Sequence, residues 1–210
     1  VFTATSHHPF RIPPRYEGRF PEGTHPIHKC VGYTDYALRL FFEKMSQYEW
    51  YGNTLFVITA DHTNQTSHDE YFTDVNSYAV PILFYHPGSN LKGLVDTIPV
   101  QQIDIMPSIL GYLSYDKPYF AYGQDIFSVD RQDKFVVNYN NQLYQFMQNG
   151  YFLQFDGHET KSVYNYKSDT FLKNNIAGTV AEQQAMETKL KAIIQQYFVR
   201  MIENDMKTAE

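Results

Sequence analysis

The segment Asn53–His68 restricts the possible folds more than any other part of the chain. It begins with a short apolar run of branched and aromatic residues, Leu55 to Ile58, and the apolar character stops before Asp61 and His62. Such a run predicts a buried strand of a parallel sheet, with Asp61 and His62 at its carboxyl end. Ligands of open α/β sheets bind outside the carboxyl ends of the strands, so we expect the chemistry there.

Asp61 and His62 are candidate metal ligands. A carboxylate oxygen and an imidazole nitrogen together suit a divalent cation such as Mn²⁺, Zn²⁺ or Mg²⁺. In the alternative interpretation Asp61 caps a following turn or helix and His62 is a polar loop residue. Spacing alone does not separate these two hypotheses. His68, Asp69 and Glu70 in the following polar loop would be further ligands or substrate contacts, although loop residues of these types are usually only solvated.

Two histidines follow a predicted strand end at Val1 to Thr5. Pro9 ends regular pairing there, because proline restricts the residue before it. His7 and His8 would contact a phosphate or sulfate, shuttle protons or bind metal, since imidazole titrates near neutral pH. The alternative is a pair of surface histidines in a proline-rich loop.

A long irregular loop is expected over Arg11–Pro26, which contains four prolines. Arg11, Arg15 and Arg19 give it a cationic bias, and guanidinium groups are natural partners of tetrahedral oxyanions. For any one of these arginines, a solvated basic loop remains the simpler interpretation.

Composition narrows the class of protein. The chain has 210 residues, 43% of them hydrophobic, which suffices for a packed core in one large domain or one and a half domains. Its 17 basic and 23 acidic residues argue weakly against nucleic acid or an anionic membrane surface as the main partner. The single cysteine, Cys30, excludes an internal disulfide, and we expect it to be a small buried apolar residue.

No apolar run approaches the roughly 18–20 residues that a membrane span requires, so the chain as given is expected to be soluble. It begins at Val1 and continues directly into functional-looking residues, from which we expect an upstream portion of the native protein.

The remaining elements follow hydrophobic periodicity. A helix is predicted at Val31–Tyr48, a second buried strand at Tyr78–Tyr85, and a helix at Val100–Leu113 that Pro107 kinks or splits. Its core face is expected to carry Ile103, Met106, Ile109, Leu110 and Leu113.

After Tyr119 the pattern changes to short strands separated by the hairpin signals Asn140-Asn141 and Asn149-Gly150. These predict an antiparallel meander over residues 134–156, with 162–166 as a candidate further strand. An amphipathic helix at Val180–Lys207 should pack on it.

Six sequence segments, taken in their order along the chain, resemble the motifs of a known family. They are Ser6-His7-His8-Pro9-Phe10, Tyr33-Thr34-Asp35-Tyr36-Ala37-Leu38, residues 53–62, Val80-Pro81-Ile82, Ile103-Asp104-Ile105-Met106-Pro107-Ser108 and Gly123-Gln124-Asp125-Ile126-Phe127. Over about residues 1–130 the chain resembles the C-terminal half of a sulfatase-family enzyme of the alkaline phosphatase superfamily. It is most similar to the lipoteichoic acid synthase branch, whose members transfer phosphoglycerol or related phospho-alcohol groups.

The resemblance implies an α/β fold that is part of an alkaline phosphatase-like three-layer sandwich. Residues 1–130 would form the C-terminal part of the catalytic domain, and residues 131–210 a small antiparallel sheet with a long helix. Asp61 and His62 would bind the catalytic divalent metal, Mn, Mg, Ca or Zn. His7, in the family's His-x-Pro-Phe motif, would hold substrate oxygens, with His8 and Arg11 as further substrate-binding residues.

The resemblance also implies what the chain lacks. The family's nucleophile is a Thr in the transferase branch or a formylglycine in true sulfatases, and it lies on the upstream half with an acidic metal ligand. Cys30 has the wrong context for that role, so this chain alone is expected to be inactive. Thr63 replaces the Gly that usually follows Asp-His, which leaves the local loop geometry open.

Three functions remain at this stage. The first is phosphoglycerol- or phosphoethanolamine-type transfer, or phosphodiester cleavage, in envelope glycan or lipid metabolism. The second is a carbohydrate sulfatase, and the third a non-catalytic aromatic-rich binding module. Expected partners are a phosphate- or sulfate-ester substrate on a glycolipid, glycan or lipid head group, and the missing N-terminal half. By the resemblance, the catalytic domain would lie outside the cytoplasmic membrane, behind an N-terminal membrane anchor.

Overall fold

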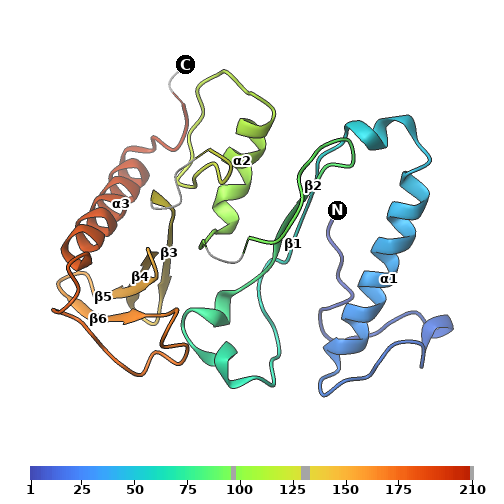
Figure 1. Ribbon diagram of the computed structural model, residues 1–210, viewed down its shortest axis with the longest axis horizontal. Coiled ribbons are helices and arrows are strands. Elements are labelled where there is room, and N and C mark those ends of the chain that lie inside the picture. The colour runs from blue at the N-terminus through green and yellow to red at the C-terminus, as the bar shows by residue number, and fades with distance from the viewer. Residues whose placement is uncertain (96–97, 129–132, 209–210) are drawn as a thin grey trace. The chain divides into compact units, whose positions relative to one another are not determined.

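A computed structural model describes residues 1–95, 98–128 and 133–208 of the chain (Figure 1). The backbone divides into two compact units, Val1–Gly93 and Leu94–Glu210, and each is described by itself. The boundary expected between residues 130 and 131 lies outside the described residues, and it stays a prediction.

The first unit consists of one long helix, a strand pair and irregular connections. Helix α1 (Ile27–Met45) begins directly after Pro26, four residues before the predicted start at Val31, because a proline is tolerated at the beginning of a helix. A short 3-10 turn at Glu49–Asn53 then leads to strand β1 (Phe56–Thr59). The expected succession of helix and strand is therefore confirmed.

Strand β1 differs from the prediction in direction and burial. It pairs antiparallel with β2 (Ile82–Tyr85), with Phe56 opposite Tyr85, so the expectation of a parallel strand is wrong. Its apolar residues are half-buried rather than buried, and β2 alternates between half-buried and exposed positions. An apolar run does not encode strand direction, because direction depends on the neighbour with which the strand pairs. The expected strand at Val1–Thr5 is absent, since these described residues have no regular structure.

Aromatic rings fix α1 against the strand pair. The Phe42 ring lies 5.2 Å from the Phe56 ring and 5.5 Å from the Tyr85 ring, in edge-on geometry. The Tyr51 and Tyr85 hydroxyls are hydrogen-bonded to each other at 3.0 Å. These contacts anchor the strand whose end carries Asp61 and His62 to the helix.

The second unit contains a four-stranded antiparallel sheet covered by a long helix. Its strands are β3 (Phe135–Asn140), β4 (Leu143–Gln148), β5 (Tyr151–Phe155) and β6 (Thr160–Asn165), paired in chain order. Helix α3 (Gln183–Glu203) lies across this sheet in Figure 1. The predicted meander and C-terminal helix are thus confirmed, and with them the α/β class.

The hairpin turns of the meander explain its register. Asn141 and Gln142 both have positive φ, as do Asn149 and Gly150, which is the backbone of tight two-residue hairpins. Residues opposite one another, such as Phe146 and Leu153, therefore place their side chains on the face that packs on α3. Met186 and Leu190 of the helix are buried in this core.

The helix expected at Val100–Leu113 forms in two pieces, as the presence of Pro107 indicated. A 3-10 turn at Gln102–Asp104 continues into helix α2 (Ile105–Tyr112). The predicted core face is wrong at Ile103, Met106 and Leu113, which are 46–63% exposed. Its other two residues, Ile109 and Leu110, are half-buried. The buried residues of this segment are instead Asp104, Pro107 and Ser108. Among the residues that the structure describes, no helix combines the length and apolar character needed to cross a membrane.

Candidate metal and oxyanion site

Asp61 and His62 lie just after β1, separated from it by Ala60, and their side chains are close to each other. The Asp61 Oδ2 atom lies 3.6 Å from His62 Nε2, and both side chains are exposed. The other carboxylate oxygen, Oδ1, accepts the backbone N–H of His62 at 3.0 Å, which fixes the orientation of the carboxylate. The structure thus brings the two predicted ligands together at the end of a strand.

The hydrogen bonds select the His62 tautomer that a metal needs. His62 Nδ1 lies 2.6 Å from the Thr63 carbonyl oxygen, which can only accept, so Nδ1 carries the proton. In the neutral ring, Nε2 then presents its lone pair beside Asp61 Oδ2. This is the usual arrangement of a metal-bound histidine, in which the second ring nitrogen donates to a carbonyl.

The separation of the two donor atoms fits a shared cation. Ligands that each lie about 2.1 Å from one ion are at most about 4.2 Å apart, and Asp61 Oδ2 and His62 Nε2 are 3.6 Å apart. Within the described parts of the chain, however, no three His, Cys, Asp or Glu side chains are grouped to hold a metal. If Asp61 and His62 bind a cation, as the sequence predicts, its other ligands would have to come from outside this pair.

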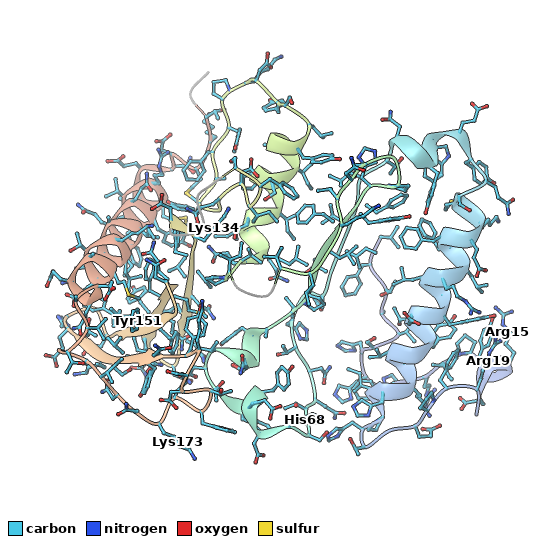
Figure 2. All side chains as sticks on the ribbon, viewed as in Figure 1. Arg15, Arg19, His68, Lys134, Tyr151 and Lys173 are labelled. Carbon is cyan, nitrogen blue, oxygen red and sulfur yellow. The ribbon has the colours of Figure 1, made fainter. Side chains whose placement is uncertain are left out.

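The polar loop after the pair does not complete the site. His68, labelled in Figure 2, has its Nδ1 4.0 Å from Glu70 Oε1. Asp69 begins the 3-10 turn at Asp69–Phe72. Among the described residues, Asp69 and Asp61 do not belong to any group of three possible metal ligands. The hypothesis that His68, Asp69 and Glu70 add ligands gains no support from their positions.

The His7–Phe10 corner is held by a small apolar core. Phe10 is buried with Ile12 and Cys30, whereas His7, His8 and the following Arg11 are exposed. The His8–Pro9 peptide bond is cis. The His8 ring packs on the anchored Phe10 ring at 4.3 Å, so the three residues predicted to bind substrate are exposed next to a fixed apolar core.

A hydrogen bond also determines which nitrogen of His7 could contact an anion. Its Nδ1 donates to the His8 carbonyl oxygen at 3.0 Å, so neutral His7 presents a lone pair at Nε2. Nε2 donates to a substrate oxygen only when the ring is protonated. The roles of His7, Asp61 and His62 stay predictions.

Cys30 is fully buried, as the sequence predicted, and its thiol points to the Pro26 carbonyl oxygen at 3.8 Å. Burial raises the pKa of the Cys30 thiol. A thiol with a raised pKa forms little thiolate, which agrees with the expectation that Cys30 is not a nucleophile.

The second unit contains a buried polar network that the sequence did not reveal. Asp104 accepts the backbone N–H groups of Gln101 and Gln124, at 2.9 and 2.8 Å. Buried Lys134 donates from Nζ to the Asp125 carbonyl oxygen at 2.6 Å. Burial raises the pKa of Asp104 and lowers that of Lys134. Because these groups bind backbone, they fix the loop around Gly123–Phe127 instead of facing a ligand.

Comparison with known proteins identifies the family. A profile of the sulfatase family matches residues 1–115, more than half of the chain. The chain belongs to the sulfatase family. It is 27% identical over 128 residues to an ulvan-active sulfatase of Formosa agariphila, a match covering 55% of this chain and 24% of that protein. The chain therefore spans about a quarter of this curated sulfatase.

Solved structures show the same fold. A protein of the alkaline phosphatase superfamily from Vibrio parahaemolyticus superimposes with a TM-score of 0.78 and 20% identity, over 100% of this chain and 50% of that one. Ps i-CgsB in complex with k-i-k-neocarrahexaose gives a TM-score of 0.64 and 14% identity, over 91% of this chain and 47% of that one. The α/β fold of this sulfatase-family chain is thus that of the alkaline phosphatase superfamily.

Proposed function

We propose that the protein is the metal-binding part of an enzyme that cleaves or transfers a phosphate or sulfate ester. The observation that carries this proposal is the Asp61–His62 pair, in which Asp61 Oδ2 and His62 Nε2 lie 3.6 Å apart just after β1. A divalent cation bound there would activate a hydroxyl nucleophile and neutralise charge on the ester oxygens. Membership of the sulfatase family supports the same chemistry.

The chain's own residues have three tasks in this reaction. Asp61 and His62 hold two sides of the cation, with Thr63 fixing the His62 ring through its carbonyl group. Protonated His7 donates from Nε2 to an ester oxygen. Arg11 next to the buried Phe10 adds a planar guanidinium for a second oxygen. The nucleophile belongs to the upstream half that the resemblance implies.

The first candidate reaction is transfer of a phospho-alcohol group, of the phosphoglycerol or phosphoethanolamine type. It is supported by the resemblance of the six segments over about residues 1–130 to the lipoteichoic acid synthase branch. An alcohol acceptor gives transfer, and water gives phosphodiester cleavage. The enzyme would then act outside the cytoplasmic membrane on an envelope glycan or lipid.

The second candidate is hydrolysis of a sulfate ester on a carbohydrate. A specific observation favours it, because the curated relative with 27% identity is an ulvan-active sulfatase. The two candidates differ in the nucleophile, which is a Thr in the first and a formylglycine in the second.

One assay on the native gene product that carries this chain separates the candidates. The product is incubated with Mn²⁺ and either bis-p-nitrophenyl phosphate or p-nitrophenyl sulfate, and p-nitrophenol release is measured. We expect release from one ester, its loss with a chelator, and at least a hundredfold loss with Asp61→Asn. His68→Gln, a nearby exposed histidine, is the matched control and should retain activity. Equal activity of Asp61→Asn and the unmodified product would contradict the proposal.

A further inference from the structure

Three arginines and four aromatic rings form one cluster on the first unit, and none of them is assigned to the ester site. It joins the long loop after Arg11 to α1. We call this the arginine–tyrosine surface, and it consists of Arg15, Tyr16, Arg19, Phe20, Tyr33, Tyr36 and Arg39. Figure 2 shows Arg15 and Arg19 next to each other beside α1.

The guanidinium groups stack on tyrosine rings. The Arg19 guanidinium carbon lies 4.1 Å from the centre of the Tyr36 ring, and that of Arg15 lies 5.0 Å from the Tyr16 ring. Arg39 lies 5.1 Å from the Tyr36 ring. A stacked guanidinium keeps its N–H edge free, so stacking orients these donors without using them.

The rings beneath the arginines are themselves fixed. The Tyr16 ring lies 5.4 Å from the Tyr33 ring and 5.8 Å from the Tyr36 ring, and Phe20 contacts all three tyrosines. Tyr16, Phe20 and Tyr33 also pack on the buried core of Phe10, Ile12 and Cys30. The loop is therefore not a loose basic segment, because its aromatic residues attach it to α1.

The charge of Arg15 and Arg19 is not compensated within the described residues. Neither lies within ion-pair distance of a carboxylate in those parts of the chain. Two carboxylates of the same elements are engaged elsewhere, Glu22 with Lys29 at 3.5 Å and Glu43 with Arg39 at 3.6 Å. Two further carboxylates, Glu17 and Asp35, are close to these arginines in the sequence, and both side chains are exposed. Two exposed, oriented cations thus stand out on a chain with a net charge of −6.

We propose that the arginine–tyrosine surface binds a sulfated polysaccharide, with Arg15 and Arg19 contacting sulfate groups on sugar units next to the one that reacts. Charge complementarity supports this ligand, because an oriented guanidinium edge matches two oxygens of a tetrahedral ester. Tyr16 and Tyr36 are half-buried, so part of each side chain remains accessible to a sugar. The choice of a glycan ester as ligand rests on the proposed function.

The surface is within reach of an oligosaccharide held at His8. Arg15 follows His8 by seven residues, a span of at most about 25 Å even when fully extended. Phe10, between them, belongs to the same apolar core as Tyr16. A polysaccharide held at His8 can therefore extend as far as this surface.

Binding of dextran sulfate by the purified protein tests the proposal without any turnover. The double variant Arg15→Gln/Arg19→Gln is compared with Lys173→Gln/Lys207→Gln, which removes two exposed cations of the second unit. Lys173 also lies over an aromatic ring, 5.2 Å from the centre of Phe171, which makes it a matched control. Uncharged dextran is the ligand control, and circular dichroism verifies that each variant is folded.

We expect the arginine double variant to weaken dextran sulfate binding about tenfold or more, because each arginine provides charge-assisted hydrogen bonds. The lysine control should change binding less than twofold. Arg15→Lys/Arg19→Lys retains the charge but loses the planar fork, and should weaken binding at least threefold.

Equal binding by the arginine double variant and the unmodified protein would overturn the proposal, as would equal binding of uncharged dextran. Full affinity of the lysine-for-arginine variant would overturn the role of the stacked geometry. The measurement uses neither metal nor ester cleavage, so its failure is distinct from failure of the proposed function.

Discussion

The Asp104 carboxylate accepts the backbone N–H of Gln124 at 2.8 Å, which ties the start of α2 to a loop twenty residues later. The Gln124 side chain in turn accepts from the Phe135 N–H at 3.3 Å, at the beginning of β3. This chain of hydrogen bonds makes α2, the loop and the meander one cooperative structure.

Gly123→Ala tests how closely that loop approaches α2. A methyl group at Gly123 would lie 2.0 Å from the Ile103 carbonyl oxygen, so the backbone must move to admit it. We expect a loss of about 1–3 kcal/mol in the free energy of unfolding, measured by thermal denaturation. Gly52→Ala is the control, since nothing lies within 4 Å of the added methyl group. Similar stability of the two variants would show that the approach is not close.

Lys134→Ala tests the buried cation. Lys134 is 1% exposed, and its Nζ atom satisfies the Asp125 carbonyl oxygen. Truncation removes that donor and the positive charge near Asp104, so we expect a loss of about 2–4 kcal/mol in the free energy of unfolding. Lys173→Ala removes an exposed cation of the same unit and should change it by less than about 0.5 kcal/mol. An equally small effect of Lys134→Ala would contradict the inferred role.

The lowered pKa of Asp156 predicts how the stability of the fold depends on pH. The backbone N–H groups of Glu159 and His158, at 2.8 and 2.7 Å, lower the pKa of Asp156 to about 2. Because the folded-state pKa is below the ordinary carboxyl value, the stabilisation is complete above about pH 4. It is lost as the pH falls toward 2.

Asp156→Asn should therefore lower the melting temperature at pH 6, and the difference from the unmodified protein should shrink between pH 4 and pH 2. The control, Asp116→Asn, changes an exposed carboxylate and should have little effect at either pH. A difference that is constant down to pH 2 would argue against the hydrogen-bonded carboxylate.

Cys30 should be unreactive while the protein is folded. It has no exposed surface, and burial raises the pKa of its thiol. We expect an aromatic disulfide reagent to label Cys30 only at the rate at which the structure opens, and at once in denaturant. Immediate labelling of the folded protein would instead indicate an accessible, reactive thiol.

Much of the fold could be predicted from the sequence, where local signals decide the structure. The Asn149-Gly150 dipeptide adopts the positive φ angles of a tight hairpin, and the apolar periodicity of α3 places Met186 and Leu190 in the core. The direction of β1 could not be predicted, because it depends on pairing with a strand more than twenty residues away. The buried face of α2 was also missed, because a polar network around Asp104 and Ser108 occupies it.

The candidate site was only partly predictable for a similar reason. Adjacent positions in the sequence sufficed to find Asp61 and His62, and the structure adds the His62 tautomer through Thr63. The stacking of Arg19 on Tyr36 joins a loop to a helix and leaves no local pattern in the sequence. Buried Lys134 likewise looked like an ordinary strand residue.

Titration of Mn²⁺ into the native gene product, followed by calorimetry, tests the central claim most directly. If Asp61 and His62 share one cation, Asp61→Asn and His62→Gln should each weaken Mn²⁺ binding by at least about tenfold, since even residues that only support metal ligands have effects of that size. The control variant His68→Gln should bind as the unmodified product does. Unchanged Mn²⁺ affinity in both Asp61→Asn and His62→Gln would contradict the account.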